Sequence, residues 1–405
     1  MATGTTNHTH NSTSHGVLAA PTPEASVLGV EAAGELSAGT TVGPVGVDAG
    51  ADPASVAVLI ASKDGAATIA DTVASAVGQC DVYVVSDGSS DATVEVARAA
   101  GAEVYVLETN VGKPAALYRT VHELGLLDRY DYLAILDDDT VIAPDFVTLC
   151  LQRFASDTTS VIVVGRTTTN WSEDVRWNPW VAARAYSYWR YQVTIRRGQD
   201  AFNALNCISG SNSMYRSGVL GQVLVERTPY IVDDTYWVLE VQRRKLGRVR
   251  YAPDAEAFVQ DPTTGRDWYK QNLRWLWGTC QGIVGHKVGR RRSWFDFWYV
   301  SLIFDWVLYA LLWPVLLVTA IAADWVQPQT VATFVAVMYS VWVAAAAIAL
   351  KKPRLVVFIP FIFAFDWLYR VNFLHAAIKT IRQPTVESCT WDSPTRYVTE
   401  KGGAT

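Results

Sequence analysis

Two long apolar segments near the C-terminal end most restrict what this chain of 405 residues can fold into. Residues 297–323 include a single charged side chain, Asp305, and residues 325–350 include none. About 20 apolar residues are enough for a helix to cross a bilayer. A charged fraction of 18% and a mean hydropathy of +0.13 also fit a chain that is partly dissolved in lipid. The pattern therefore predicts two transmembrane helices.

Basic residues beside these segments predict an orientation. The loop 323–329 between them has no Lys or Arg, whereas the outer flanks are basic, with Lys287, Arg290, Arg291, Arg292, Lys351, Lys352 and Arg354. Basic loops stay on the cytoplasmic side of a membrane. We therefore expect an integral protein of the plasma (inner) membrane that contacts membrane lipid and carries its preceding domain in the cytoplasm.

A third apolar segment, 355–369, is shorter and contains Pro360 and Asp366. Three full crossings would place the basic residues of the C-terminal tail outside, against the same charge rule. We expect this segment to be re-entrant or interfacial. The region 287–378 would then hold two or three hydrophobic segments, followed by a polar tail at 379–405.

Charge, cysteines and the N-terminal segment exclude other classes. The formal net charge of -5 gives no support for a nucleic-acid partner. The five cysteines are an odd number without a CxxC pair, which predicts reduced thiols. Residues 1–54 have only acidic charges and no compact apolar run, so we expect a disordered leader and not a signal peptide.

From residue 55 to about 164, short apolar runs alternate with amphipathic stretches. Strands are expected at 56–60, 82–85, 103–107, 132–136 and 161–164, with helices at 66–77, 92–100 and 114–124. This alternation predicts a parallel, doubly wound α/β sheet. Ligands of such sheets bind beyond the carboxyl ends of the strands, which directs attention to the residues that follow each run.

Acidic residues follow three of these strands. Asp64 and Asp87 come after the first two, and each could simply belong to a turn or a helix cap. Three consecutive carboxylates, Asp137, Asp138 and Asp139, follow the fourth strand. Their mutual repulsion would be relieved by a divalent cation, and oxygen ligands favour Mg²⁺ or Mn²⁺. Alternate residues of an extended chain point the same way, which pairs the first and third of these carboxylates.

Two later motifs carry further candidate side chains. Asp233 and Asp234 precede a helix-like stretch, where they could act at the helix N-terminus or in chemistry. Residues 267–275 combine Gln271, Arg274 and Trp275. Arginine is a fork for phosphate oxygens, while the tryptophans could stack on sugar rings or form a membrane-interface belt.

The segment 171–199 is rich in Trp, Tyr and Arg. That composition suits a helix lying in the membrane interface. An ordinary packing helix with many aromatic residues is the alternative.

In this order, the motifs resemble those of glycosyltransferase family 2, in its membrane-embedded processive branch of hyaluronan, chitin and cellulose synthases. The resemblance extends from residue 55 to the C-terminal end. The matching elements are Ser86-Asp87-Gly88-Ser89 for DDGS, Asn110-Val111-Gly112-Lys113 for NxGK, Asp137-Asp138-Asp139 for DxD, Gly210–Arg216 for the acceptor segment, Val232-Asp233-Asp234 for TED and Gln271–Trp275 for Q(Q/R)xRW. Ser86, Asp233 and Asn272 depart from these patterns.

The resemblance implies a fold and a set of roles. The fold would be a nucleotide-sugar-binding domain of GT-A type, with a Rossmann-like mixed sheet, at 55–286, and the QxxRW region would occupy 267–286. Donor binding would involve Asp64, Asp87, Lys113, Asp137 and Asp138, and the cation would bind Asp139 and Asp137. Asp234, with Asp233, would supply the catalytic base. The acceptor and diphosphate would contact Gln271, Arg274 and Trp275.

The implied activity is inverting transfer from a nucleotide-sugar, expected to be a UDP-sugar, to a growing β-linked glycan. An alternative enzyme transfers one sugar to a polyprenyl phosphate or another lipid acceptor, and a different class is a non-catalytic scaffold that binds nucleotide-sugars. Paired membrane helices ahead of the catalytic domain, present in the synthases, are missing from this sequence. A polymer channel would therefore require a homo-oligomer.

Overall fold

The computed structural model describes residues 55–387, and the predicted leader and most of the polar tail lie outside this range. The elements in chain order are β1 (Val56–Ser62), α1 (Ile69–Val77), β2 (Asp81–Asp87), α2 (Thr93–Ala99), β3 (Glu103–Leu107), α3 (Lys113–Glu123), α4 (Leu126–Arg129), β4 (Tyr132–Asp137), β5 (Thr140–Ile142), α5 (Phe146–Ser156), β6 (Ser160–Thr169), η2 (Glu173–Val175), α6 (Pro179–Tyr191), η3 (Gln192–Arg196), α7 (Arg197–Ala201), β7 (Ser213–Arg216), α8 (Ser217–Val223), α9 (Asp233–Arg244), β8 (Arg248–Val259), α10 (Gly265–Gly285), α11 (Trp294–Val307), η4 (Leu308–Leu312), α12 (Trp313–Ala322), α13 (Pro328–Ala349), η5 (Pro353–Phe358) and α14 (Ile359–Arg382).

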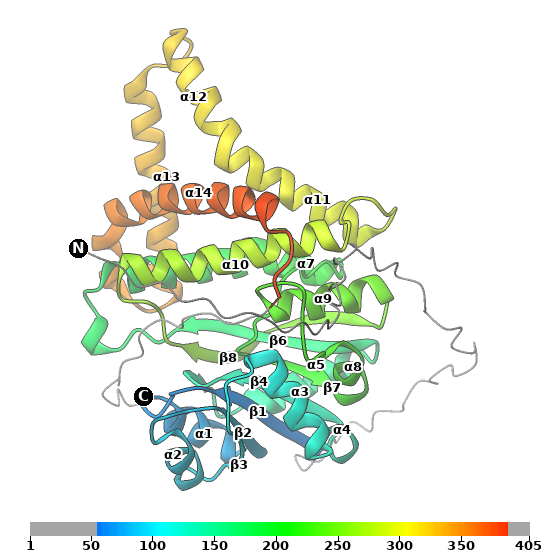
Figure 1. Cartoon of the computed structure of the whole chain (residues 1–405). Coiled ribbons are helices and arrows are strands. Elements are labelled where there is room, and N and C mark those ends of the chain that lie inside the picture. The colour runs from blue at the N-terminus through cyan, green and yellow to red at the C-terminus, as the bar shows by residue number, and fades with distance from the viewer. Residues whose placement is uncertain (1–54, 388–405) are drawn as a thin grey trace, which may run out of the picture. The chain divides into compact units, whose positions relative to one another are not determined.

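These elements build one mixed sheet of eight strands in the order β3-β2-β1-β4-β7-β6-β8-β5. The first four strands are parallel, as predicted. The expectation of a wholly parallel sheet is wrong, because β7 runs antiparallel to both β4 and β6, and β5 runs antiparallel to β8. The mixed sheet implied by the resemblance is the one that forms. The parallel half brings the ends of β1, β2 and β4 to one edge (Figure 1).

The strands at the centre of the sheet are buried on both faces. Along β1, Ala57 and Leu59 join one core cluster, while Val58 and Ile60 join a second cluster on the opposite face. This follows from the alternation of side chains in a strand. The unbroken apolar run 56–60 of the sequence is thereby explained, since a strand covered on both faces needs no polar alternation.

Helices α10 and α14 lie side by side above the sheet in Figure 1. Along their length, Asn372 Nδ2 donates to the backbone oxygen of Tyr269 at 2.9 Å, and Tyr269 Oη lies 2.9 Å from His375 Nδ1. Trp277 Nε1 and Gln281 Nε2 both donate to the oxygen of Gln383, at 3.2 and 3.0 Å. Helix α14 is therefore joined to α10 by polar contacts along much of its length.

By length and composition, three helices within residues 55–387 could cross a membrane, namely Trp294–Ala322, Pro328–Ala349 and Pro353–Arg382. The third is longer than the segment 355–369 that the sequence suggested. Its helix continues to Arg382, and the added part includes buried polar residues such as Asn372 and Thr380.

The aromatic-rich segment folds mainly as α6 and η3. Residues 181–186 of α6 are buried, and two tryptophans contact the C-terminal helices: Trp180 packs on Phe361 and Phe365, and Trp189 packs on Trp342. The helix is thus a packing element that joins the sheet to the apolar helices. Its predicted position in a membrane interface stays a prediction.

Candidate functional site

Asp64 ties together the loops that follow β1 and β2. Its Oδ1 accepts hydrogen bonds from Ser90 N at 2.7 Å and Ser90 Oγ at 3.1 Å, and its own N–H donates to Ser89 Oγ at 3.1 Å. The bond from the Ser90 backbone lowers the pKa of Asp64, which is therefore ionised at neutral pH. Asp64 has a positive φ of 52°, a conformation in which Asp is one of the more tolerated residues.

Asp87 is buried at the end of β2 and shapes the loop before α3. Its two carboxylate oxygens accept from the backbone N–H groups of Val111 and Gly112, at 2.7 and 2.9 Å. Gly112, with φ of 88°, precedes the first residue of α3, Lys113. The side chain predicted to bind donor directly is therefore also the one that positions Lys113.

Lys113 connects the end of β4 with the loop before β7. Its Nζ forms an ion pair with Asp137 Oδ1 and donates to the backbone oxygen of Gly210 at 3.2 Å. The N–H of Gly210 in turn donates to Asp234 Oδ2 at 3.1 Å. A Cβ at position 210 would lie 3.3 Å from both Asp234 Oδ2 and Lys113 Nζ. Glycine here lets the lysine, the backbone and the carboxylate approach one another closely.

Carboxylates outnumber cations in this cluster. Burial lowers the pKa of Lys113, but the charges of Asp137, Asp233 and Asp234 more than offset that effect and raise it. Burial, followed by the neighbouring charge of Asp233, raises the pKa of Asp234 to about 7. Oδ2 of Asp233 is itself buried and has no hydrogen-bond partner. The cluster therefore holds a carboxylate that can gain or lose a proton near neutral pH.

The three consecutive carboxylates after β4 do not share one environment. Asp138 is 2% exposed, and its Oδ2 accepts from Ser62 Oγ at 2.6 Å. The side chain of Asp137 is 41% exposed, and Asp139 is half-buried. The Asp138 carboxylate contacts the last residue of β1, and its role in donor binding stays a prediction.

Asp137 and Asp139 offer the hard oxygen ligands that Mg²⁺ and Mn²⁺ prefer. Within residues 55–387, no three His, Cys, Asp or Glu side chains meet as metal ligands. Mg²⁺ sites commonly use one or two carboxylates and take their remaining ligands from water and substrate phosphates. The two carboxylates therefore fit a cation that also binds the phosphate group of a ligand.

The motif on α10 is organised around Arg184 of α6, a residue that the sequence analysis did not select. Arg184 is 1% exposed. Its guanidinium donates to Gln271 Oε1 at 2.9 Å and to Asn272 Oδ1 at 3.1 Å, and it lies over the ring of Trp275 at 5.0 Å. Its ion-pair partner is Asp261, 3.3 Å away and equally buried. Only the composition of 171–199, aromatic residues among arginines, gave any signal of this role.

Arg274 differs from its neighbours on α10. Its Nε is buried without a hydrogen-bond partner, and it has no ion pair within the described part of the chain. A buried donor that is left unpaired costs free energy, which a ligand acceptor would recover. Gln271, Arg274 and Trp275 lie on α10, whereas Asp234 lies on α9. The two groups are linked through packing of Val232 against Leu273 and Trp277.

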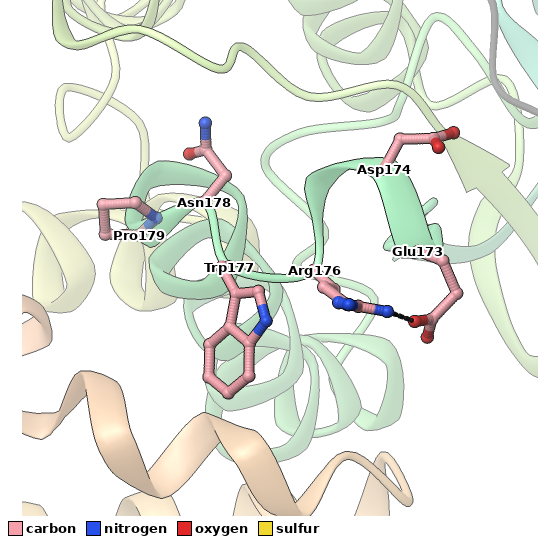
Figure 2. Close-up of a pocket in the computed structure, with 6 residues that line it drawn as sticks. All are labelled: Glu173, Asp174, Arg176, Trp177, Asn178 and Pro179. Carbon is pink, nitrogen blue, oxygen red and sulfur yellow. Dashed lines mark hydrogen bonds and ion pairs between the residues drawn. The ribbon is translucent and has the colours of Figure 1, made fainter.

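A cavity of about 680 Å³ lies apart from these residues, on the loop between β6 and α6 (Figure 2). It is lined by residues 173–179, among them Trp177, which is 59% exposed. Arg354, from the segment after α13, lies over the Trp177 ring at 5.8 Å and forms an ion pair with Glu173 at 3.3 Å. Because no predicted site residue lines this cavity, we do not assign the chemistry to it.

A sequence profile described as glycosyltransferase like family 2 matches residues 53–278, more than half of the chain. The chain belongs to glycosyltransferase family 2. The matched range includes every predicted site residue, from Asp64 to Trp275. The predicted family and enzyme class are thereby confirmed, while the role of each residue stays a prediction.

Two curated relatives are similar to this chain over about 60% of its length. Poly-beta-1,6-N-acetyl-D-glucosamine synthase of Staphylococcus epidermidis is 26% identical over 261 residues, 60% of this chain and 56% of the relative. The protein of the same description from Staphylococcus aureus (strain COL) is 25% identical over 58% of this chain and 55% of its own length. The chain thus spans about half the length of the curated relatives it matches.

A mannosyltransferase from Pyrobaculum calidifontis, solved with GDP-Man and Mn²⁺, shares the fold. It is 16% identical, covers 82% of this chain and 88% of its own, and has a TM-score of 0.54. At this identity the likeness concerns the fold alone. The GT-A type fold expected from the sequence is confirmed.

Proposed function

We propose that this protein is an inverting membrane glycosyltransferase that extends a β-linked polysaccharide from a nucleotide-sugar. The observation that carries the proposal is the cluster of Lys113, Asp137 and Asp234, in which one carboxylate has a pKa near 7. The relatives suggest N-acetylglucosamine as the sugar, because their descriptions name a polymer of it. UDP-N-acetylglucosamine is therefore the first donor to test.

In the proposed reaction, Asp234 is the general base. Its carboxylate would remove the proton from an acceptor hydroxyl as that oxygen attacks the anomeric carbon and the nucleoside diphosphate leaves. A base acts best when its pKa lies near the working pH, and Asp234 meets this condition because burial and Asp233 disfavour its charge. The Gly210 N–H holds one carboxylate oxygen at 3.1 Å and so orients the group.

Lys113 and the carboxylates after β4 would serve the donor. A cation on Asp137 and Asp139 would stabilise negative charge on the diphosphate. Lys113, held against Asp137 and Gly210, adds a positive charge beside the same position. Asp87 fixes the backbone from which Lys113 projects, and the ionised Asp64 would meet polar groups of the nucleoside.

The α10 motif would serve the acceptor and leaving group. Arg274 has an unpaired buried Nε that suits a phosphate oxygen. Trp275 offers a ring on which a sugar can stack, and the guanidinium of Arg184, which lies over this ring, holds it in place. A rival function, transfer of a single sugar to a lipid, uses the same nucleotide chemistry. The named relatives are polymer synthases and favour the first function.

We further propose that the catalytic domain and the C-terminal end of α14 share the cytoplasmic side. Residues of α14 from Asp366 onwards bond to α6 and α10, the pairs being Arg190 with Asp366 and Tyr269 with Asn372 and His375. Because this part of α14 is bonded to helices of the catalytic domain, it would stay on the same side of the bilayer as that domain. This arrangement keeps Lys379 and Arg382 inside, as the charge rule requires.

The test uses the full-length protein in purified membranes or detergent, supplied with UDP-N-acetylglucosamine and Mg²⁺ or Mn²⁺. Nucleoside diphosphate release and product mass are measured together, with UDP-glucose and GDP-mannose as comparison donors. A ladder of β-linked N-acetylglucosamine chains is expected, and EDTA should abolish it. A single-sugar lipid product without a ladder would refute the polymerase. Donor binding without turnover would support the scaffold instead.

A further inference from the structure

A groove of about 500 Å³ lies at the N-terminal end of α11, on the basic loop that precedes the first candidate span. One end is basic and the other is apolar, with a lining formed by Gly289, Arg291, Arg292, Ser293, Asp296, Phe297, Val300, Ser301 and Phe304. None of these residues takes part in the proposed transfer reaction.

Asp296 fastens the basic loop onto α11. Its carboxylate accepts two hydrogen bonds from Arg243 of α9, at 2.5 and 2.9 Å, and a third from the N–H of Gly289 at 2.6 Å. Asp296 is 2% exposed. The only carboxylate that lines the groove is therefore neutralised from the catalytic-domain side and does not repel an anion.

The cationic end of the groove is left without a partner. Arg291 and Arg292 are exposed, and neither forms an ion pair within residues 55–387. Two guanidinium groups that line one groove offer a strong site for phosphate oxygens. They remain attached to a loop whose shape Asp296 and Gly289 determine.

The apolar end runs along one side of α11. Phe297, Val300 and Phe304 are spaced three and four residues apart and are 56%, 43% and 62% exposed. Residues at this spacing share one face of a helix. This face begins shortly after the two arginines in sequence and lies within the candidate span Trp294–Ala322.

We propose that this groove binds one anionic glycerophospholipid, with its phosphate on Arg291 and Arg292 and an acyl chain along Phe297 and Phe304. Both ends of the groove are needed for this occupant, whereas a soluble phosphate would use only the basic end. The inference depends on the chain residing in a bilayer and not on its catalytic activity.

The test is native mass spectrometry of the full-length protein in detergent with equal phosphatidylglycerol and phosphatidylcholine. Wild type should retain phosphatidylglycerol over phosphatidylcholine by about tenfold, since each basic residue near a membrane surface adds to anionic-lipid affinity. R291Q/R292Q should bring this ratio close to one. The replaced side chains are exposed and unpaired, so the unfolding temperature should not change.

The matched control is K287N/R290Q, which removes two charges from the same loop outside the groove. Asn suits position 287 because Lys287 has a positive φ of 51°. This variant should keep the wild-type ratio. Equal losses in both double variants would mean a diffuse charge effect and would overturn the proposal.

The apolar end is tested by F304S, which should shorten the retention of phosphatidylglycerol in the gas phase and leave binding of soluble glycerol phosphate unchanged. Retention of phosphatidylglycerol by F304S equal to that of wild type would show a simple anion site and would contradict a lipid occupant. A change from dimer to monomer in R291Q/R292Q would instead assign the groove to contact between two copies of the chain.

Discussion

Two basic residues in contact with acidic partners, Lys113 and Arg184, have different surroundings. Lys113 lies among Asp137, Asp233 and Asp234, so negative charge exceeds positive charge there. Arg184 faces the single carboxylate of Asp261, and its other contacts are neutral amides and aromatic rings.

An unbalanced cluster cannot keep all of its charges at neutral pH, and one group becomes able to exchange a proton. Asp234 is that group. Burial also raises the pKa of Asp261, to about 6, but the charge of Arg184 opposes this rise, and the second cluster holds its partners in one arrangement. Arg184 fixes Gln271 and Trp275 in this way. The difference suggests that the first cluster performs the chemistry and the second positions the groups around it.

The largest expected effect is at the unbalanced cluster itself. Asp234→Asn keeps the shape of the side chain but removes the base, so turnover should fall about a thousandfold. The measurement is nucleoside diphosphate release at saturating donor, with donor affinity determined separately and expected to change little. Glu95→Gln is a control that removes the same charge from an exposed side chain of α2. Turnover above a tenth of wild type in Asp234→Asn would exclude it as the base.

Loss of the positive charge of Lys113 in the same cluster should have the next largest effect on turnover. Lys113→Met should lower turnover about a hundredfold, as expected for the loss of one charge-stabilising donor at a reacting group. Lys113→Arg should recover part of this activity, because the positive charge is kept. If Met and Arg at this position behave alike, the role of Lys113 lies in loop packing and not in charge.

The pH dependence of turnover tests the same cluster with a smaller effect. Because Asp234 must be deprotonated to act, turnover should fall about tenfold per pH unit below its pKa, which lies at about 7. Lys113 lowers this pKa, so Lys113→Met should move the acid limb to higher pH. An acid limb near pH 4 in wild type would mean that Asp234 is not perturbed as proposed.

The Arg184 cluster should respond in stability more than in turnover. Arg184→Met removes the ion-pair partner of the buried Asp261 carboxylate, which should cost about 3–5 kcal/mol of unfolding free energy. Turnover should fall less than in Lys113→Met, with a rise in the acceptor KM, because Trp275 loses its neighbour. R184M/D261L should recover most of the stability. A turnover loss in this double variant equal to that of Lys113→Met would refute the division between the two clusters.

Local sequence patterns were sufficient to predict the parallel half of the sheet. The apolar runs of β1, β2 and β4 are separated by helices of ordinary length, and right-handed crossovers leave little choice of topology for such units. The antiparallel β7 could not be found in this way. It follows the long segment 170–212, and its direction depends on where that segment returns to the sheet.

The candidate site was predicted where acidic residues directly follow strands. Asp137 meets this condition and Asp234 instead precedes a helix, and the structure brings both to Lys113. The contact of Asp138 could not be predicted, because a run of three carboxylates does not reveal which one will accept a hydrogen bond from Ser62. Arg184 shows a second limit, since its partners lie 87 and 88 residues away in sequence.

The sequence by itself determined the strand-end motifs, the family and the apolar helices, because these depend on neighbouring residues and on periodicity. Only the tertiary structure decided which charges meet and whether their signs balance. Burial and distance set the free energy of a charged group, and both arise when segments far apart in the chain pack together. Asp234 and Asp261 are both aspartates with pKa values raised by burial, and only their partners distinguish the proposed base from a structural anchor.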